Sequence, residues 1–161
     1  MNSDNIADVV SKVIENLLPK MTLDIAKALS YAVEKKAQEI GVNAVICVSD
    51  TGARPVLVHS MDDAYIASFD IAVNKAYTVV SLKMPTSKLK DLAALGGSLY
   101  GIQHTNNGQI VIFGGGDPLI YGGKIIGGLG VSGGTEEQDT ELSRYGAMVF
   151  EEIIKNFRKD I

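Results

Sequence analysis

The sequence predicts an α+β domain built on an antiparallel sheet. Short apolar runs over 43–49 and 54–60 are separated by residues 50–53, whose composition suits a hairpin turn. A second pair of runs, over 118–121 and 124–131, is joined by a Gly-Gly step. Strands that follow one another as hairpins, with no crossover helix between them, favour antiparallel pairing with helices packed on the sheet. A further strand is expected over 109–113.

Helical periodicity and helix-ending residues predict the remaining elements. The helices are expected over 6–18, 22–41, 68–83, 85–92 and from 135 towards the C-terminus. Thr22 suits the N-cap of the second helix and Gly41 its C-terminal stop. Pro85 ends one helix and opens the next. Thr135 and Gln138 have the spacing of a capping box at the start of the last helix.

Length and composition restrict the class of protein. The 161 residues, 46% of them hydrophobic, suit one substantial core, and a net charge of −4 without clustered Lys or Arg argues against nucleic acid or an anionic membrane as a partner. Cys47, the one cysteine, lies in an apolar run, where a buried structural thiol is expected rather than a nucleophile. With no basic leader and no apolar run of about 18 residues, we expect a cytoplasmic protein.

Two glycine clusters are candidate ligand contacts. Residues 128–133 match G-x-G-x-x-G, but one helix alone follows the motif and its first turn is acidic, so we expect no nucleotide. The second cluster is Gly114, Gly115 and Gly116, followed by Asp117 and Pro118. Such a run permits a plain turn between strands or a close approach of the backbone to a ligand, and spacing alone leaves both open.

The polar candidates are few. His59 and His104 are the only histidines, and neither lies in a metal-binding motif; each suits a surface position, although an axial haem ligand needs only one such nitrogen. Lys75 and Thr78 share a helix face with Ile71. A lysine there is ordinarily solvated, but beside a pocket it could bind a carboxylate or a haem propionate. No nucleophile elbow of the G-x-S-x-G type is present.

Several motifs in order resemble one family. They are Thr22-Leu23-Asp24-Ile25-Ala26, Val48-Ser49-Asp50-Thr51-Gly52, Met61-Asp62-Asp63-Ala64, Asp70-Ile71-Ala72-Val73-Asn74-Lys75-Ala76-Tyr77-Thr78, Gly114-Gly115-Gly116-Asp117-Pro118-Leu119 and Gly127-Gly128-Leu129-Gly130-Val131-Ser132-Gly133-Gly134 with Glu137-Gln138-Asp139. Together they resemble the GlcG-like, HbpS haem-binding and PduO C-terminal domain family, over about residue 22 to the C-terminus.

The resemblance implies a profilin-like antiparallel sheet with helices on its faces, a homo-oligomer, and haem or a related tetrapyrrole as ligand in some members. It makes Lys75, Thr78, the 114–118 loop and Asp139 expected ligand-binding residues, with His59 and His104 as weaker candidates for binding haem iron. Arg54 departs from the glycine often found after the 50–53 turn. Because the resemblance is to the C-terminal domain of PduO, we do not expect the adenosyltransferase activity of full-length PduO in this chain.

Residues 1–20 lie outside this resemblance, before a family-like domain over 21–161. Their short amphipathic helix resembles peptides that direct enzymes into bacterial microcompartments. A helix of this length gains its order by docking in a groove, and the resemblance implies a groove on a shell protein. Packing on its own domain or on a neighbouring subunit is the alternative.

Three functions follow from the sequence. The first is a small-molecule binding module with an accessory role in propanediol, ethanolamine or glycolate utilisation. The second is an enzyme acting on a small hydroxy acid, aldehyde or haem, with Lys75 and Asp139 in charge stabilisation or proton transfer. The third is an assembly protein.

Overall fold

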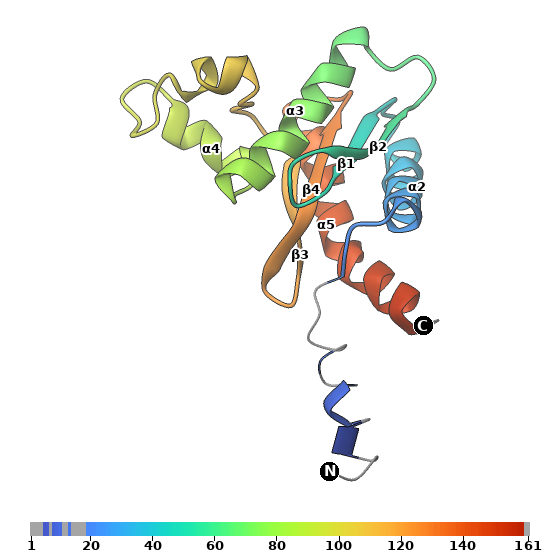
Figure 1. Ribbon diagram of the computed structural model, residues 1–161. Helices are drawn as coiled ribbons and strands as arrows, with labels where there is room; N and C mark the ends of the chain where they lie inside the picture. Colours follow the sequence, from blue (N-terminus) through green and yellow to red (C-terminus); the bar gives the residue numbers. More distant parts are fainter. Residues whose placement is uncertain (1–4, 7, 11–12, 14–18, 160–161) are drawn as a thin grey trace.

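The computed structural model describes residues 5–6, 8–10, 13 and 19–159. Its elements, in chain order, are α2 (Leu23–Glu39), β1 (Val45–Ser49), β2 (Pro55–Ser60), α3 (Ile66–Leu82), α4 (Thr86–Ala93), the 3-10 turns η1 (Ile102–His104) and η2 (Asn106–Gly108), β3 (Gly116–Tyr121), β4 (Lys124–Ser132) and α5 (Glu136–Lys159) (Figure 1). The predicted targeting helix over 1–20 lies largely outside the described residues, so its role stays a prediction.

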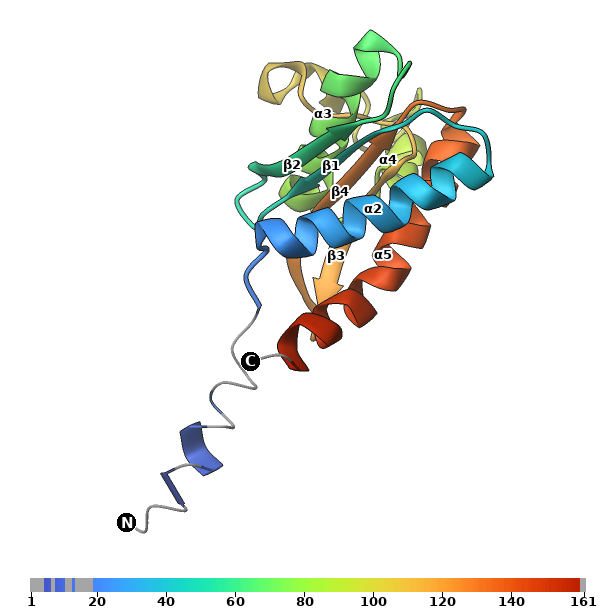
Figure 2. The same cartoon turned by 90° about the vertical axis from the view of Figure 1, so that its right-hand side faces the viewer.

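The four strands form one sheet in the order β2-β1-β4-β3, and all three neighbouring pairs are antiparallel. Helices α2 and α5 cover one face, whereas α3 lies across the other (Figure 2). The predicted α+β class, with an antiparallel sheet and helices on its faces, is therefore confirmed. No helix in the described ranges is both long enough and apolar enough to cross a bilayer.

Strand β1 is buried along its whole length because helices cover both of its faces. Ile46 and Val48 belong to the core under α2 and α5. Val45 and Cys47 pack with Ala72 and Ala76 of α3. A continuous apolar run, rather than an alternating one, is what such a strand requires. Burial raises the pKa of the Cys47 thiol to about 12, as expected for a structural cysteine.

Glycines in β4 bring α3 unusually close to the sheet. A Cβ at Gly130 would collide with the Ala72 carbonyl oxygen, and one at Gly128 would meet the Ala76 carbonyl. The first two glycines of the G-x-G-x-x-G pattern therefore serve the contact between a strand and a helix, and Gly133 packs against the backbone of 43–44. The motif runs along the end of a central antiparallel strand, unlike the phosphate-binding turn of a dinucleotide domain.

Local signals fixed most boundaries correctly. The Thr22 hydroxyl oxygen accepts a hydrogen bond from the Ile25 amide at 3.3 Å. Thr135 and Gln138 form the predicted reciprocal capping box, with distances of 2.9 and 3.2 Å. Gly122 and Gly123 both have positive φ, as a tight two-residue hairpin requires.

The predicted strand over 109–113 is wrong. This segment pairs with no strand and packs beside α3, where the Thr78 hydroxyl accepts a hydrogen bond from the Val111 amide at 3.0 Å. Ile110 is buried, which accounts for the apolar run. Strand β3 begins at Gly116, two residues before the predicted start. The segment therefore uses a helix hydroxyl, rather than a neighbouring strand, to satisfy a backbone amide.

Candidate functional site

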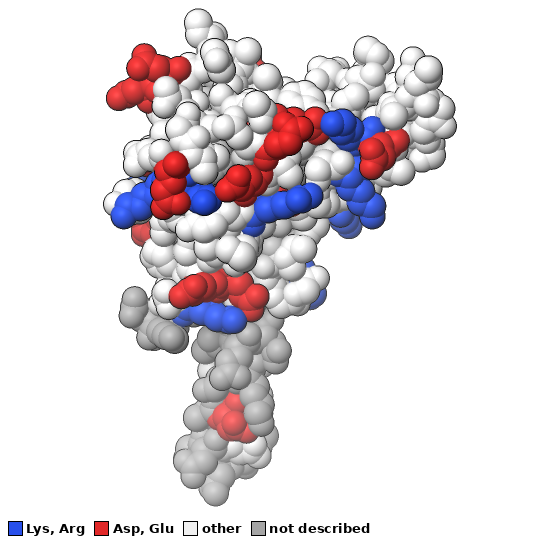
Figure 3. Space-filling model, turned by 180° about the vertical axis from the view of Figure 1, so that it is seen from behind, with Lys and Arg blue, Asp and Glu red and all other residues white. Residues whose placement is uncertain are grey.

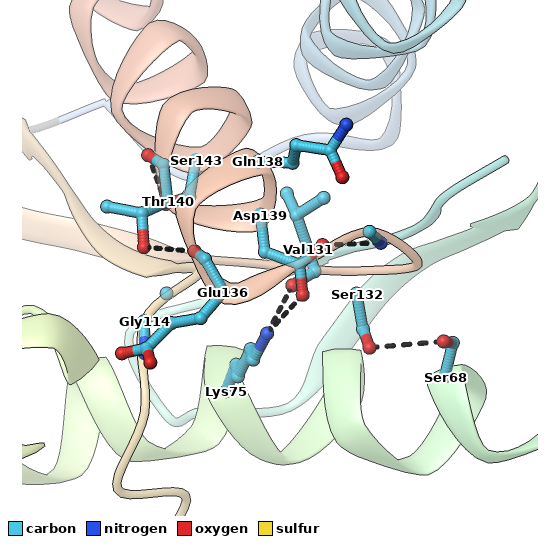
Figure 4. A network of polar contacts seen from close by, with 12 residues as sticks. Ser68, Lys75, Gly114, Val131, Ser132, Glu136, Gln138, Asp139, Thr140 and Ser143 are labelled. Atoms are coloured by element: carbon cyan, nitrogen blue, oxygen red, sulfur yellow. Dashed lines mark hydrogen bonds and ion pairs between the residues drawn. The ribbon is translucent and has the colours of Figure 1, made fainter. Parts of the chain in front are cut away.

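A buried ion pair joins α3 to α5 (Figure 4). The Lys75 ammonium lies 2.8 Å from Asp139 Oδ2, and the two side chains are 0% and 5% exposed. The same ammonium donates to the Val131 carbonyl at 2.8 Å and lies 4.9 Å from the centre of the Phe113 ring. The ordinary expectation of a solvated lysine is wrong here, because α3, β4 and α5 enclose this side chain.

Asp139 also closes the turn between β4 and α5. Its Oδ1 accepts a hydrogen bond from the Gly134 amide at 2.9 Å. Burial raises the pKa of Asp139, while the neighbouring Lys75 ammonium and these backbone donors act in the opposite direction. Burial likewise lowers the pKa of Lys75, and Asp139 opposes that change. Each charge thus depends on the other for its compensation.

The three glycines of the 114–118 cluster pack against α3, α4 and α5, and Gly115 lies against the ion pair itself. Gly115 has a φ of +109°, and a Cβ there would lie 2.5 Å from the Lys75 nitrogen and 2.7 Å from Asp139 Cβ. The Gly114 amide donates to Glu136 at 3.0 Å, and the Gly116 amide donates to the Thr86 hydroxyl at 2.9 Å. The backbone therefore approaches the helices closely, and this contact is with protein groups.

The other predicted ligand-binding residues lie near the same elements. Thr78 is buried beside the 109–111 backbone. Asp117 accepts a hydrogen bond from the Ser143 hydroxyl at 2.6 Å, and burial raises the pKa of its carboxyl. Pro118 pairs with Gly128 in the sheet. The structure thus gathers this set around α3, β3 and α5, and a role for these residues in binding a ligand stays a prediction.

A hollow of about 280 Å³ opens above the ion pair, between the start of α3, the end of β4 and the start of α5. Its apolar lining includes Tyr65, Ile71 and Phe113. Its polar lining is Ser68, Ser132, Glu136 and Asp139, with the backbone of 133–134. The Ser132 and Ser68 hydroxyl oxygens are 3.1 Å apart, and both residues are 4% exposed (Figure 4). Lys75 lies beneath the hollow rather than in its lining.

Two other hollows adjoin this region. One of about 460 Å³ shares Tyr65, Gly133 and Gly134 with the first. The other, of about 440 Å³, lies between α4 and α5 and includes Lys90 and Glu136, whose ion pair measures 2.6 Å.

Acidic and basic side chains alternate across the rear of the molecule (Figure 3). Charges of both signs there compensate one another.

The two histidines lie outside these three hollows. His59 is in β2, where its imidazole contacts Glu34 of α2 at 3.2 Å. His104 is exposed in η1 beside Gln103. Within the described residues, no group of three or more His, Cys, Asp and Glu side chains is arranged to hold a metal ion. A role for either histidine in binding iron stays a prediction.

Sequence reasoning did not single out Tyr65, Ser68, Phe113 and Ser132 as site residues. Ser132 lies inside the 127–134 glycine motif and Phe113 directly precedes Gly114, but nothing local marks a serine as facing a cavity. Ser68 and Ser132 are 64 positions apart and meet only because α3 crosses β4. The one signal that could have indicated a site residue was the small Ser68, which lies one turn before Ile71 and therefore on the same helix face.

The structure defines a small α+β domain in which a four-stranded antiparallel sheet is covered by helices on both faces. A family model described as "Haem degrading protein HbpS-like" matches residues 21–148, and the chain belongs to this HbpS-like family.

Known proteins share most of this domain. The chain is 49% identical over 133 residues to an uncharacterised 15.0 kDa protein from the dhaT-dhaS intergenic region of Citrobacter freundii, covering 83% of this chain and 94% of that one. It is 37% identical over 116 residues to the corrinoid adenosyltransferase PduO of Salmonella typhimurium, covering 72% of this chain and only 34% of that protein. The crystal structure of a PduOC:heme complex has a TM-score of 0.77 and 33% identity, covering 81% of this chain and 94% of the other.

Proposed function

We propose that this protein is a small-molecule binding module whose ligand is haem or a related tetrapyrrole, with an accessory role in a catabolic pathway. The observation that carries the proposal is the aromatic-rimmed hollow above a buried ion pair, in a chain 33% identical to a domain crystallised with haem. Tyr65 and Phe113 are 73% and 38% exposed at its rim. Exposed aromatic side chains beside a recess suit a planar apolar ligand.

A haem site ordinarily offers an apolar surface, a ligand for the iron and partners for the propionates, and the described residues offer candidates for the first two. An apolar surface is supplied by Ile71, Phe113 and the Tyr65 ring. The residue types that ordinarily ligate haem iron are His, Cys, Met and Tyr, and Tyr65 is the only one lining these three hollows. Neither hollow beside Tyr65 is lined by Lys or Arg, so the propionates would face solvent. Tyr65 therefore joins His59 and His104 as a candidate iron ligand.

Titration with haemin tests the proposal. We expect a Soret band that saturates at one haem per chain. Tyr65→Phe removes the phenol oxygen and keeps the ring, so it should change the ferric absorption and electron paramagnetic resonance spectra if Tyr65 binds iron. Tyr31→Phe is the matched control, because Tyr31 is exposed on α2 and lines none of the three hollows. A wild-type protein whose spectrum shows only free haemin would refute the proposed ligand.

An enzymatic function is the second candidate, favoured by the ion pair at the floor of the hollow. Asp139 lines the hollow and has a raised pKa, which suits a group that exchanges a proton. Lys75 would stabilise its charge. Turnover of a small aldehyde, a hydroxy acid or haem that is abolished by Asp139→Asn would support this function. Activity that survives both Asp139→Asn and Lys75→Met would reject it.

The cellular setting is proposed from the relatives. PduO is named as a corrinoid adenosyltransferase, and this chain matches about a third of it. We propose association with propanediol or a similar catabolic pathway, in the cytoplasm and within a microcompartment, as a homo-oligomer. Deleting residues 1–20 should abolish co-localisation with shell proteins and leave haemin binding intact. Unchanged co-localisation would show that this segment is no targeting peptide.

A further inference from the structure

The two buried serine hydroxyls at the hollow form a donor site that the haem proposal does not use. Ser68 lies in the first turn of α3 and Ser132 at the end of β4. Both line the hollow, and both are 4% exposed. Buried hydroxyl groups are ordinarily satisfied by hydrogen bonds. The way in which these two are satisfied determines what the hollow can hold.

Two hydroxyl groups carry two hydrogens, and the bond between them uses one. Ser132 Oγ and Ser68 Oγ share a single hydrogen bond of 3.1 Å. Among the hydrogen bonds of residues 19–159, the second hydrogen has no protein acceptor, and each oxygen keeps a lone pair. A hydroxyl group both donates and accepts. The pair therefore offers one donor and at least one acceptor to a guest in the hollow.

The charges around the hollow disfavour an ionic guest. Asp139 and Glu136 line it, but their partners Lys75 and Lys90 do not. An anion would meet two carboxylates in the lining of the hollow, and no ammonium group lines it. A cation would lose its hydration next to carboxylates that are already engaged by lysines and by the backbone amides of 114 and 134. A neutral head group avoids both costs.

The volume of the hollow suits a short molecule. Liquid water occupies about 30 Å³ per molecule, so 280 Å³ corresponds to roughly nine waters, or about ten non-hydrogen atoms of a ligand. Ala67, Ile71 and Phe113 give the side away from the hydroxyls an apolar surface. A guest with a polar head and a short hydrocarbon tail matches this division.

We infer that this hollow binds a short uncharged molecule, of the amide, alcohol or carbonyl class, whose head hydrogen-bonds to Ser68 and Ser132 while its tail contacts Ile71 and Phe113. This inference goes beyond the proposed haem function. The small guest would share Ile71 and Phe113 with the apolar surface proposed for haem, and Ser68 and Ser132 are the groups that it alone would use.

Three probes with the same tail test the head-group preference. Hexanamide, hexanoate and hexylammonium are titrated into 15N-labelled full-length protein at pH 7, and amide shifts are followed by NMR. We expect hexanamide to shift the amides of residues 68, 71, 113 and 132, and to bind at least tenfold more tightly than either ion. Equal or tighter binding of hexanoate or hexylammonium would overturn the inference.

Matched serine variants test the hydroxyl pair. Ser68→Ala should weaken hexanamide binding at least fivefold, and Ser132→Ala should do the same. Ser81→Ala, on the exposed part of the same helix, should leave it unchanged. The amide spectra report whether each variant is folded, so a folded Ser68→Ala protein that binds hexanamide normally rejects the site.

Haemin titration separates this inference from the haem proposal. A Soret band with no localised hexanamide shifts would refute the small-molecule site and keep the haem function. Localised hexanamide shifts without a Soret band would support the small-molecule site and refute the haem function.

Discussion

Replacing Lys75 with methionine should cost this protein a large part of its stability. The substitution keeps a long side chain but leaves the Asp139 carboxylate, 5% exposed, without its counter-ion. Removing one partner of a buried ion pair typically costs about 3–5 kcal/mol. The remaining hydrogen bond from the Gly134 amide, at 2.9 Å, supports the carboxylate but does not neutralise it. We therefore expect a loss of about 3–5 kcal/mol at pH 7, a large share of the stability of an ordinary domain.

The loss should shrink as the pH falls. Burial raises the pKa of Asp139, and removing Lys75 removes the main opposing influence. The folded variant then binds the Asp139 proton more tightly than the unfolded chain does. The penalty is full above the folded pKa and is relieved as protonation proceeds. Lys75→Met should accordingly lose less stability, relative to the unmodified protein, at pH 5 than at pH 7.

Urea unfolding followed by circular dichroism measures both effects, provided that the slope of the transition stays constant. Lys27→Met, at an exposed position of α2, is the control and should lie within about 0.5 kcal/mol of the parent. The double variant Lys75→Met with Asp139→Leu removes both charges, so it should lose less than Lys75→Met alone. A loss below about 1 kcal/mol for Lys75→Met at pH 7 would refute the reasoning.

Three further predictions concern packing and reactivity. Gly115→Ala should lower the free energy of unfolding in urea by about 3 kcal/mol or more, because the new side chain would have a positive φ and would also collide with the ion pair. Gly123 has a positive φ in open space, so the control Gly123→Ala should cost about 1 kcal/mol. Equal costs for the two variants would contradict the collision. Thr78→Val should lower the free energy of unfolding by about 1–3 kcal/mol and speed hydrogen exchange at the Val111 amide, which donates to the Thr78 hydroxyl. Unchanged exchange would show that this hydrogen bond does not hold the 109–113 segment against α3. Cys47 should react with a thiol reagent at pH 8 only as the chain unfolds, and rapid labelling of the native protein would contradict its burial.

Features set by neighbouring residues could be predicted from the sequence. Thr22 and the Thr135–Gln138 pair cap helices within one turn of themselves, and the Gly122-Gly123 step has the positive φ values that its hairpin needs. The antiparallel class followed from these short connections. Their chemistry is local, so no knowledge of the rest of the fold was required.

Features that depend on distant partners could not be predicted in the same way. The periodicity of α3 put Lys75 and Thr78 on one face, but the burial of Lys75 depends on Asp139, 64 positions later. The segment 109–113 has the composition of a strand, and Thr78 takes the amide that a neighbouring strand would have bound. The resemblance named Lys75, Asp139 and the 114–118 loop together, and the structure places Gly115 of that loop beside the ion pair. Tyr65, Ser68 and Phe113 of the hollow lie outside the motifs of the resemblance, and Ser132 lies inside the 127–134 motif, where nothing distinguishes it as a site residue.

The close seating of α3 on the glycines of β4 has a consequence for how a guest enters. Ser68 and Ser132 belong to these two elements, and a helix whose backbone rests directly on a strand has little freedom to slide. We therefore expect the part of the recess between Ser68 and Ser132 to have its final shape before any molecule arrives, so that little ordering entropy is lost on association. Entry should be a single step whose observed rate rises linearly with guest concentration, with no slow rearrangement following it.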